Sequence, residues 1–195
     1  SYQTMSLTWN NVLSWGHTWG DHTLDLMAGH EAYTYTTSYQ YGYGAGIMQQ
    51  GQLELANTTR DWSSHSSADA YALLSFFGKI DYNYANKYYI SGSFRRDGSS
   101  RFHPDNRWGN FWSLGAAWVM TNEDFMSNTS NWLDMLKIKL SYGSQGNDGI
   151  GNFLYTDLYN LQSAGGAIST VLASKGNKNI TWETNANFNA GVDFS

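Results

Sequence analysis

The sequence predicts an all-β fold, an antiparallel up-and-down meander of strands of the kind that forms a transmembrane β-barrel. Three observations lead to this prediction: stretches of alternating apolar and polar residues, 16% aromatic beside only 14% charged residues, and connections of alternating length. Residues 136–142 and 185–194 show the alternation most clearly, because their even positions are apolar and most of their odd positions are polar. Side chains alternate across a strand, so each stretch has one face for an apolar environment and one for water.

The composition narrows the class of protein. Charged residues make up about half the roughly 25% that is usual in a soluble domain, whereas 9 Trp and 14 Tyr suit boundaries where a ring is buried and its polar tip stays wet. Outer-membrane barrels and sugar-binding modules both have this composition. The absence of Cys excludes disulfides and Cys-based zinc sites, and a net charge of -5 without a basic run argues against nucleic acid as a partner.

The first part of the chain predicts a β-hairpin followed by a long loop. Residues 7–15 and 22–33 each carry apolar side chains at alternate positions, and the short Gly20-Asp21 break between them is typical of a hairpin turn. Residues 34–69 are rich in Tyr, Ser, Thr, Gly and Gln without a sustained period. We therefore expect a long loop there, with at most short local structure.

The middle of the chain predicts three further strands. Residues 76–84 and 88–97 alternate and are joined by a tight turn at residues 85–87, and residues 98–107 form a polar loop. Residues 108–120 are the fifth strand, with Trp, Leu, Ala and Met at even positions.

A short segment follows the fifth strand, where Thr121 or Asn122 is placed to cap one helical turn. Residues 136–142 and 185–194 are the sixth and seventh strands, separated by a loop over residues 144–182. Seven strands are therefore expected.

Two further patterns favour a membrane barrel over a soluble sheet. The longer connections are expected at one end of the meander, as in outer-membrane barrels, and most alternating stretches approach the 9 to 11 residues or so that cross a bilayer. Aromatic residues lie near the strand ends, where they would form girdles at the two membrane interfaces. No stretch of 18 apolar residues encodes a transmembrane helix. The aromatic residues in question are Tyr82, Tyr84, Tyr88, Trp108, Trp112, Trp118, Trp182 and Phe194.

Five motifs in order carry a resemblance to a known family. They are RRDGSSRF at residues 95–102, RWGNFWSLGAAW at 107–118, NEDF at 122–125, LKIKLSYGSQGN at 136–147 and NITWETNANFNAGVDF at 179–194. With these motifs the chain resembles the SusC/RagA family of TonB-dependent outer-membrane transporters. The resemblance is strong over residues 76–195 and loose over the first 70 residues.

The resemblance implies a fold, a location and partners. It implies that residues 1–195 are part of one TonB-dependent receptor barrel domain, a segment of a large transmembrane β-barrel of 22 strands. It implies TonB-dependent import of oligosaccharide, or of peptide, through the cell outer membrane, with a SusD-like surface lipoprotein as a lid. No plug domain, TonB-contacting box, signal peptide or terminal strand is recognisable, so we expect an internal segment with no enzymatic activity of its own.

Candidate site residues follow from these expectations. Sugar or peptide contacts are predicted for loop or lumen residues, although an ion-pair network that fixes the loop is the alternative for the arginines. The predicted ligand-contacting residues are Tyr41, Tyr43, Trp62, Arg95 and Arg101. The residues predicted to face the lumen, where they would also contact a plug, are Lys79, Asp81, Asn83, Lys137, Lys139, Asn185, Asn187 and Asn189.

No catalytic, metal or cofactor site is predicted. The five histidines show no recurring ligand spacing, and Asp97, Asp105, Asp148 and Asp157 lie in or beside different loops. Two other functions stay open on the sequence alone. One is a secreted all-β module that binds carbohydrate on aromatic residues, and the other is a complete small outer-membrane barrel with an eighth strand within residues 34–69.

Overall fold

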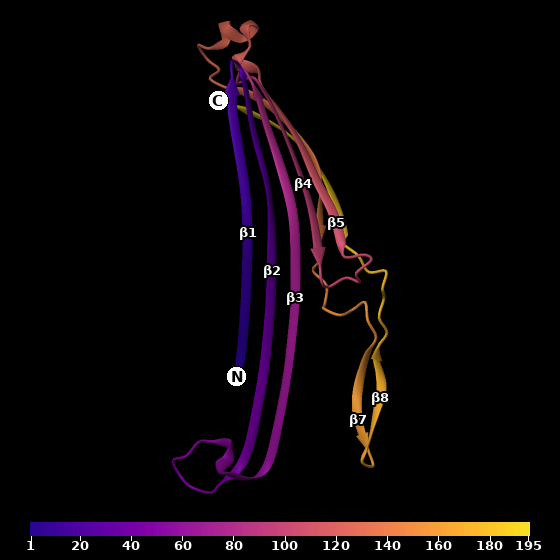
Figure 1. Cartoon of the computed structure of the whole chain (residues 1–195). Helices are drawn as coiled ribbons and strands as arrows, with labels where there is room; N and C mark the ends of the chain where they lie inside the picture. Colours follow the sequence, from indigo (N-terminus) through magenta and orange to yellow (C-terminus); the bar gives the residue numbers. More distant parts are fainter.

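The computed structural model describes the backbone of residues 1–195 and the side chains of residues 1–163 and 165–195. Seven strands form one long curved sheet in the order β1-β2-β3-β4-β5-β6-β9, and β7 and β8 form a separate hairpin (Figure 1). Every neighbouring pair is antiparallel. This confirms the predicted meander.

The elements have the following bounds. The strands are β1 Tyr2–Trp19, β2 His22–Ile47, β3 Thr58–Tyr84, β4 Tyr88–Ser99, β5 Trp108–Val119, β6 Leu136–Asn147, β7 Leu158–Ala164, β8 Ala167–Ser174 and β9 Glu183–Phe194. The 3-10 helices are η1 Leu55–Asn57, η2 Met120–Asn122 and η3 Asp124–Thr129. No helix of the described residues is long and apolar enough to span a membrane.

The sheet is open and a single layer thick. In the sheet order, β1 and β9 lie at opposite edges, so the complete eight-stranded barrel considered above is wrong. Among the described side chains, only Phe102 and Phe111 are both apolar and buried. A β-sandwich needs a buried core between two packed sheets, so the chain does not have the architecture of a soluble sandwich module.

The predicted loop over residues 34–69 is wrong. β2 and β3 continue through it and pair in register from His22↔Tyr84 to Tyr43↔Ser63. Only residues 48–57 connect the two strands. The prediction depended on apolar residues alternating with polar ones. Here Tyr alternates with Thr, Ser, Gln and Gly, and Tyr differs from these residues in size more than in hydropathy.

Two smaller predictions also need correction. The loop over residues 144–182 contains the β7–β8 hairpin, whose turn is Gly165-Gly166 with both φ angles positive. The N-cap residues of the 3-10 helices η2 and η3 are Val119 and Glu123, and neither makes a side-chain cap hydrogen bond. Neither Thr121 nor Asn122 therefore acts as the cap.

The connections at the two ends of the sheet overlap in length. At one end, called here the turn end, lie Gly20-Asp21, the turn at residues 85–87 and the η2–η3 segment (Figure 1). At the other, the loop end, lie residues 48–57, 100–107 and 148–182. The connection at residues 120–135 is longer than that at 48–57, so length alone does not separate the ends.

Candidate functional site

The sheet has two chemically different faces. The face called here the polar face carries the odd-numbered side chains of β2, β3, β4, β5, β6 and β9, which the pairing places in rows. Lys139 pairs with Gly191, and Ser141 pairs with Asn189. All the residues predicted to face the lumen lie on this face, namely Lys79, Asp81, Asn83, Lys137, Lys139, Asn185, Asn187 and Asn189.

Two lysines of the polar face are paired with carboxylates of the same face. Lys79 Nζ lies 2.7 Å from a carboxylate oxygen of Asp81, and Lys139 Nζ lies 2.7 Å from Asp193. Both pairs are about half exposed, so solvent screens them and they contribute little to stability. They leave a hydrated surface with alternating charges, which is suited to a polar solute.

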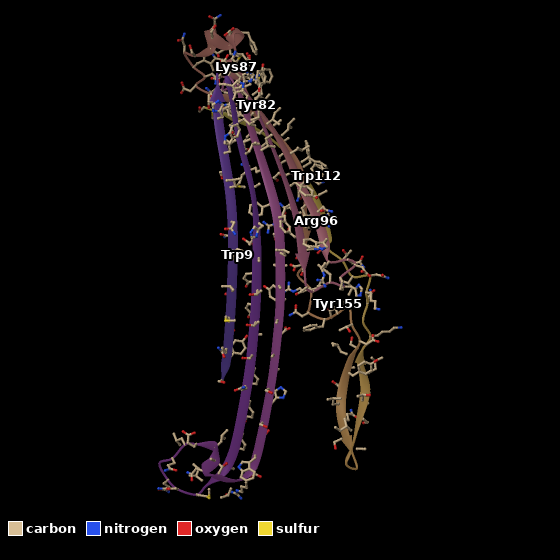
Figure 2. All side chains as sticks on the ribbon, in the orientation of Figure 1. Trp9, Tyr82, Lys87, Arg96, Trp112 and Tyr155 are labelled. Atoms are coloured by element: carbon tan, nitrogen blue, oxygen red, sulfur yellow. The ribbon has the colours of Figure 1, made fainter. Side chains whose placement is uncertain are left out.

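The opposite face, called here the apolar face, carries aromatic rings at the turn end of the sheet. Neighbouring rings from β1 to the η3 helix have centroids 4.9–6.4 Å apart, within the range of favourable ring contacts. Tyr82 lies beside this row at the turn end (Figure 2). We call the row the inner ladder; its members are Trp15, His17, Trp19, His22, Tyr84, Tyr88, Trp118 and Phe125.

A second aromatic row, the outer ladder, crosses the same face farther from the turns. Trp9 meets His30 edge to face at 5.2 Å, His30 lies 6.3 Å from Phe76, and Phe76 lies 6.4 Å from Trp108. Figure 2 shows Trp9 and Arg96 at this middle level of the sheet. At about 3.3 Å per residue and a tilt near 40°, the two ladders are about 20 to 25 Å apart, close to the apolar band of a membrane barrel.

The NEDF motif attaches the η2–η3 segment to the inner ladder. The Glu123 carboxylate accepts hydrogen bonds from Tyr88 Oη, from Lys87 Nζ at 3.0 Å and from Trp118 Nε1 at 3.1 Å. The bond from Tyr88, followed by that from Lys87, holds the pKa of Glu123 below its ordinary value. The same carboxylate raises the pKa of Lys87. One acidic residue thus joins β4, β5 and the preceding turn.

Arg95 lies on the polar face in a compact network. Its Nε donates to both carboxylate oxygens of Asp97 at 2.7 and 2.9 Å, and its Nη2 donates to Ser75 Oγ at 2.8 Å. Its Nη2 also lies 3.8 Å from Glu31. The structure thus contains the ion pairs weighed as the alternative role, and ligand contact by Arg95 remains a prediction.

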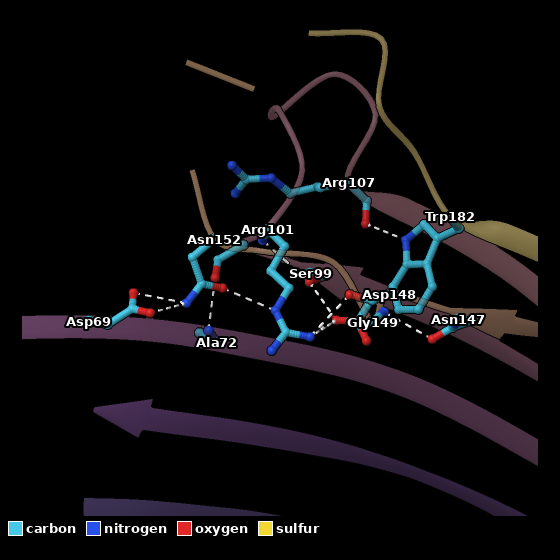
Figure 3. Close-up of polar contacts among 11 residues, drawn as sticks. Asp69, Ala72, Ser99, Arg101, Arg107, Asn147, Asp148, Gly149, Asn152 and Trp182 are labelled. Atoms are coloured by element: carbon cyan, nitrogen blue, oxygen red, sulfur yellow. Dashed lines mark hydrogen bonds and ion pairs between the residues drawn. The ribbon is translucent and has the colours of Figure 1, made fainter. Parts of the chain in front are cut away.

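Arg101 joins two loops to the sheet (Figure 3). Its Nε donates to Asn152 Oδ1 and its Nη1 donates to the backbone oxygen of Asp148, each at 3.0 Å. Asn152 in turn donates to both carboxylate oxygens of Asp69 at 2.8 Å, and Ser99 Oγ donates to Asp148 at 2.8 Å. We call these five residues the loop anchor, because they fix residues 148–152 against β3 and β4.

An apolar contact holds the other end of the same loop. Trp182 packs against Phe111 and Phe102 with centroids 5.3 and 5.4 Å apart. Its Nε1 donates to the backbone oxygen of Arg107 at 2.8 Å (Figure 3). A Cβ at Gly109 would lie 2.9 Å from Trp182. The prediction that Trp182 belongs to an interface girdle is therefore wrong, because its ring covers the small core of the loop end.

Tyrosines form a row on the polar face beyond the outer ladder, which the sequence analysis missed. Tyr33 and Tyr35 contact Tyr71 with centroids 5.8 and 5.4 Å apart, and the Arg101 guanidinium lies 4.1 Å from the Tyr71 ring centroid. Tyrosine at every second position was the available signal. The members on β2 are Tyr33, Tyr35, Tyr39, Tyr41 and Tyr43.

The predicted ligand-contacting residues do not form one cluster. Tyr41 and Tyr43 lie in the tyrosine row. Trp62 immediately precedes Ser63, the partner of Tyr43, and therefore lies on the opposite face. The Trp62 Nε1 donates to Thr58 Oγ1 at 2.6 Å. The partner of Arg95 on β3, Phe77, is 12 residues from that of Tyr41, His65, about 40 Å along the strand.

Three of the five histidines lie on the apolar face. His17 and His22 are members of the inner ladder, and His30 belongs to the outer ladder, where its Nε2 lies 3.1 Å from Asn11 Nδ2. His65 and His103 lie elsewhere, near Tyr39 and Asp105. No group of three His, Asp or Glu side chains in the described part of the chain is placed to hold a metal ion.

Known proteins match this sequence and fold over almost the whole chain. No family model matches. A TonB-dependent receptor of Formosa agariphila is 32% identical over 95% of this chain and 18% of its own length. The TonB-dependent receptor SusC of Bacteroides thetaiotaomicron is 30% identical over 97% of this chain and 19% of its own length. The chain is homologous, over almost its whole length, to a segment of SusC-type TonB-dependent receptors.

Solved structures support the same assignment. The RagAB peptide transporter superposes with a TM-score of 0.90 at 29% identity, over 98% of this chain and 22% of that chain. The RagAB peptide importer in its open-open state gives a TM-score of 0.88. The sheet therefore has the fold of a segment of a TonB-dependent barrel. The chain spans about a fifth of the length of the curated relatives it matches.

Proposed function

We propose that residues 1–195 are part of the barrel domain of an outer-membrane TonB-dependent importer, with the apolar face toward lipid and the polar face toward the lumen. The observation that carries this proposal is the continuity of the two faces across seven strands in register. The two aromatic ladders support it, because their separation matches a bilayer. The missing strands and the plug would come from the rest of the receptor.

The polar face is the proposed wall of the passage. Its charged side chains and its asparagine row can exchange hydrogen bonds with water, with a plug or with a passing solute. The tyrosine row continues this wall outward and offers ring faces that suit sugars and peptide side chains alike. The proposed cargo is an oligosaccharide or a peptide, and Tyr41 and Tyr43 are its proposed first contacts.

The loop end is the proposed site of partner contact. The loop anchor fixes residues 148–152, and the β7–β8 hairpin beyond it projects away from the sheet (Figure 1). Leu161 and Ile168 on that hairpin are 74% and 79% exposed. Exposed apolar side chains that lie together are typical of a surface that contacts another protein. A SusD-like surface lipoprotein is the proposed partner here, and TonB would act on the full receptor through its other regions.

Single cysteines in the full-length receptor test the orientation of the two faces. Leu140 and Ser141 are neighbours on β6 that point to opposite faces, and the segment contains no Cys of its own. A membrane-impermeant thiol reagent should label Ser141→Cys, while a bimane probe on Leu140→Cys should be quenched by brominated lipid. The reverse pattern, or equal labelling, would contradict the proposal.

The cargo needs a separate experiment. Cells lacking the receptor gene should lose uptake of one class of labelled compound, either oligosaccharides or peptides, and regain it with the intact gene. A Tyr41→Ala, Tyr43→Ala double variant should raise the concentration needed for half-maximal uptake, because it removes two ring faces. Unchanged uptake of both classes in the deletion strain would reject the importer proposal.

A further inference from the structure

One cation of the sheet lies on the apolar face. Arg96 occupies an even position of β4, with Phe76 beside it on β3 and Asn110 beside it on β5. Its side chain is exposed, and its guanidinium carbon lies 5.2 Å from the centroid of the Trp108 ring. Figure 2 shows it at the level of the outer ladder. Arg96 is therefore at the boundary where the apolar band ends.

Arg96 differs from most cations of the sheet in its partners, and from Lys137, which lies over the Tyr89 ring, in its face. Lys79, Lys139 and Arg95 lie on the polar face and each pairs with a carboxylate within 2.7 Å. No ion pair or side-chain hydrogen bond of the described residues involves Arg96. Its partners are instead an aromatic ring and an uncharged amide, so its positive charge is uncompensated by the protein.

That position has a physical cost unless an anion is nearby. A guanidinium beside hydrocarbon loses hydration, and a cation held in such a place is normally paired. The guanidinium lies over the Trp108 ring, and in the described part of the chain its N–H groups have no side-chain hydrogen-bond partner. A planar fork of N–H donors matches the oxygen atoms of a phosphate, which can accept two parallel hydrogen bonds.

We propose that Arg96, stacked on Trp108 and flanked by Asn110, binds the phosphate of a membrane-lipid headgroup. This inference rests on the proposed function, because it requires the apolar face to meet the bilayer. The ligand class follows from charge and depth: phosphates are the anions that a bilayer presents at the level of its interfacial tryptophans. The Asn110 amide is placed to donate a further hydrogen bond to the same headgroup.

Lipid binding to the full-length receptor in detergent tests the proposal. The probe is lipid A, a bisphosphorylated glycolipid, titrated by native mass spectrometry. Arg96→Ala should weaken lipid A binding about tenfold, the effect of losing a charge-assisted contact of about 1.4 kcal/mol. Arg96→Lys should lose less lipid A affinity than Arg96→Ala, because lysine keeps the positive charge although it lacks the planar set of N–H donors. Dephosphorylated lipid A should bind wild type and Arg96→Ala equally.

Controls separate this site from general electrostatics and from the proposed function. Lys79→Ala removes one positive charge from the polar face and should leave lipid A binding unchanged. Wild-type affinity in Arg96→Ala, an equal loss in Lys79→Ala, or displacement of the lipid by excess inorganic phosphate would each overturn the proposal. Failure of the proposed function would give a different result from failure of the phosphate site. If the apolar face did not meet the bilayer, the wild-type receptor would stay dispersed without detergent.

Discussion

The two halves of the β2–β3 hairpin have the same backbone structure but different side-chain chemistry. Near the turn end, residues 22–33 and 74–84 alternate apolar and polar side chains; toward residues 48–57, tyrosines alternate with small polar residues. The two strands pair without interruption through both halves as far as Tyr43 and Ser63. Alternation of hydropathy therefore indicates that the two faces of a strand meet different environments. A strand can form without such alternation, because it needs only side chains that are compatible with a pleated sheet.

The outer ladder marks the boundary between these halves. On the turn side of it, the apolar face carries Leu, Ile, Phe and Trp. Beyond it, the same face of β2 and β3 carries mostly Thr, Ser, Gln, Gly and Ala, with Leu74 and Trp62 as the large apolar exceptions. A strand that leaves a bilayer no longer needs an apolar face, because water can surround both sides. The comparison thus predicts that the cost of a charged substitution depends on depth as well as on face.

The largest effect is expected for a charge on the apolar face between the ladders. Leu140 lies on β6 opposite Ala116, farther from the turns than the Ile138–Trp118 pair of the inner-ladder level. Leu140→Lys should lower the free energy of unfolding of the full-length receptor in lipid by about 2 to 4 kcal/mol. Denaturant titration in vesicles, followed by tryptophan fluorescence, measures this change.

Two matched variants accompany that measurement. Ser141→Lys places the same charge on the polar face one residue away and should cost no more than about 1 kcal/mol. Ile138→Lys lies at the ladder level, where the lysine can reach the interface, and should cost less than Leu140→Lys. Equal costs at positions 140 and 141 would show that the two faces meet similar environments.

The half of the fold near the turn end could be predicted from the sequence, and the half beyond the outer ladder could not. Residues 108–120 and 185–194 were placed to within one or two residues of β5 and β9, because one face of each is apolar along most of its length. The extension of β2 to Ile47 and of β3 from Thr58 was missed, since tyrosine counts as neither clearly apolar nor clearly polar.

The polar face was predictable for the same reason, whereas the loop contacts were not. Periodicity alone placed Lys139 and Asn189 on one face. The loop anchor joins Asp69, Arg101 and Asn152, which are far apart in sequence, and no local pattern predicts that they meet. Trp182 was misplaced because an aromatic residue near a strand end is equally typical of an interface girdle and of a small core.

A smaller effect, local to the loop end, is expected from the loop anchor. Arg101→Ala should leave the Asp148 carboxylate with only its Ser99 contact and remove the bond to Asn152, at a cost of about 1 to 3 kcal/mol. Hydrogen exchange of residues 148–152 in the full receptor should become faster, while exchange in β5 and β6 should not change. A uniform increase across the sheet would mean that the anchor supports the barrel and not only the loop.

The Glu123 cluster predicts a pH dependence of stability at the turn end. Because the pKa of Glu123 is lowered in the folded state, the unfolded state takes up a proton first as the pH falls. The stabilisation is therefore complete above the ordinary Glu pKa and is lost between that value and the lowered one. Thermal unfolding of wild type and Glu123→Gln should differ at neutral pH and converge at acidic pH. A difference that persists below both values would contradict this account.

The smallest effect is expected beyond the outer ladder, on the same face that is sensitive between the ladders. Ala70 lies on β3 six residues past Phe76, about 20 Å along the strand, and is exposed. Ala70→Lys should change the free energy of unfolding in lipid by less than about 0.5 kcal/mol, because water already surrounds that position. Ile80→Lys, at the level midway between Phe76 and Tyr84, is the matched comparison and should cost about 2 to 4 kcal/mol. A comparable loss at Ala70 would place the outer half of the hairpin against an apolar partner and move the membrane boundary away from the outer ladder.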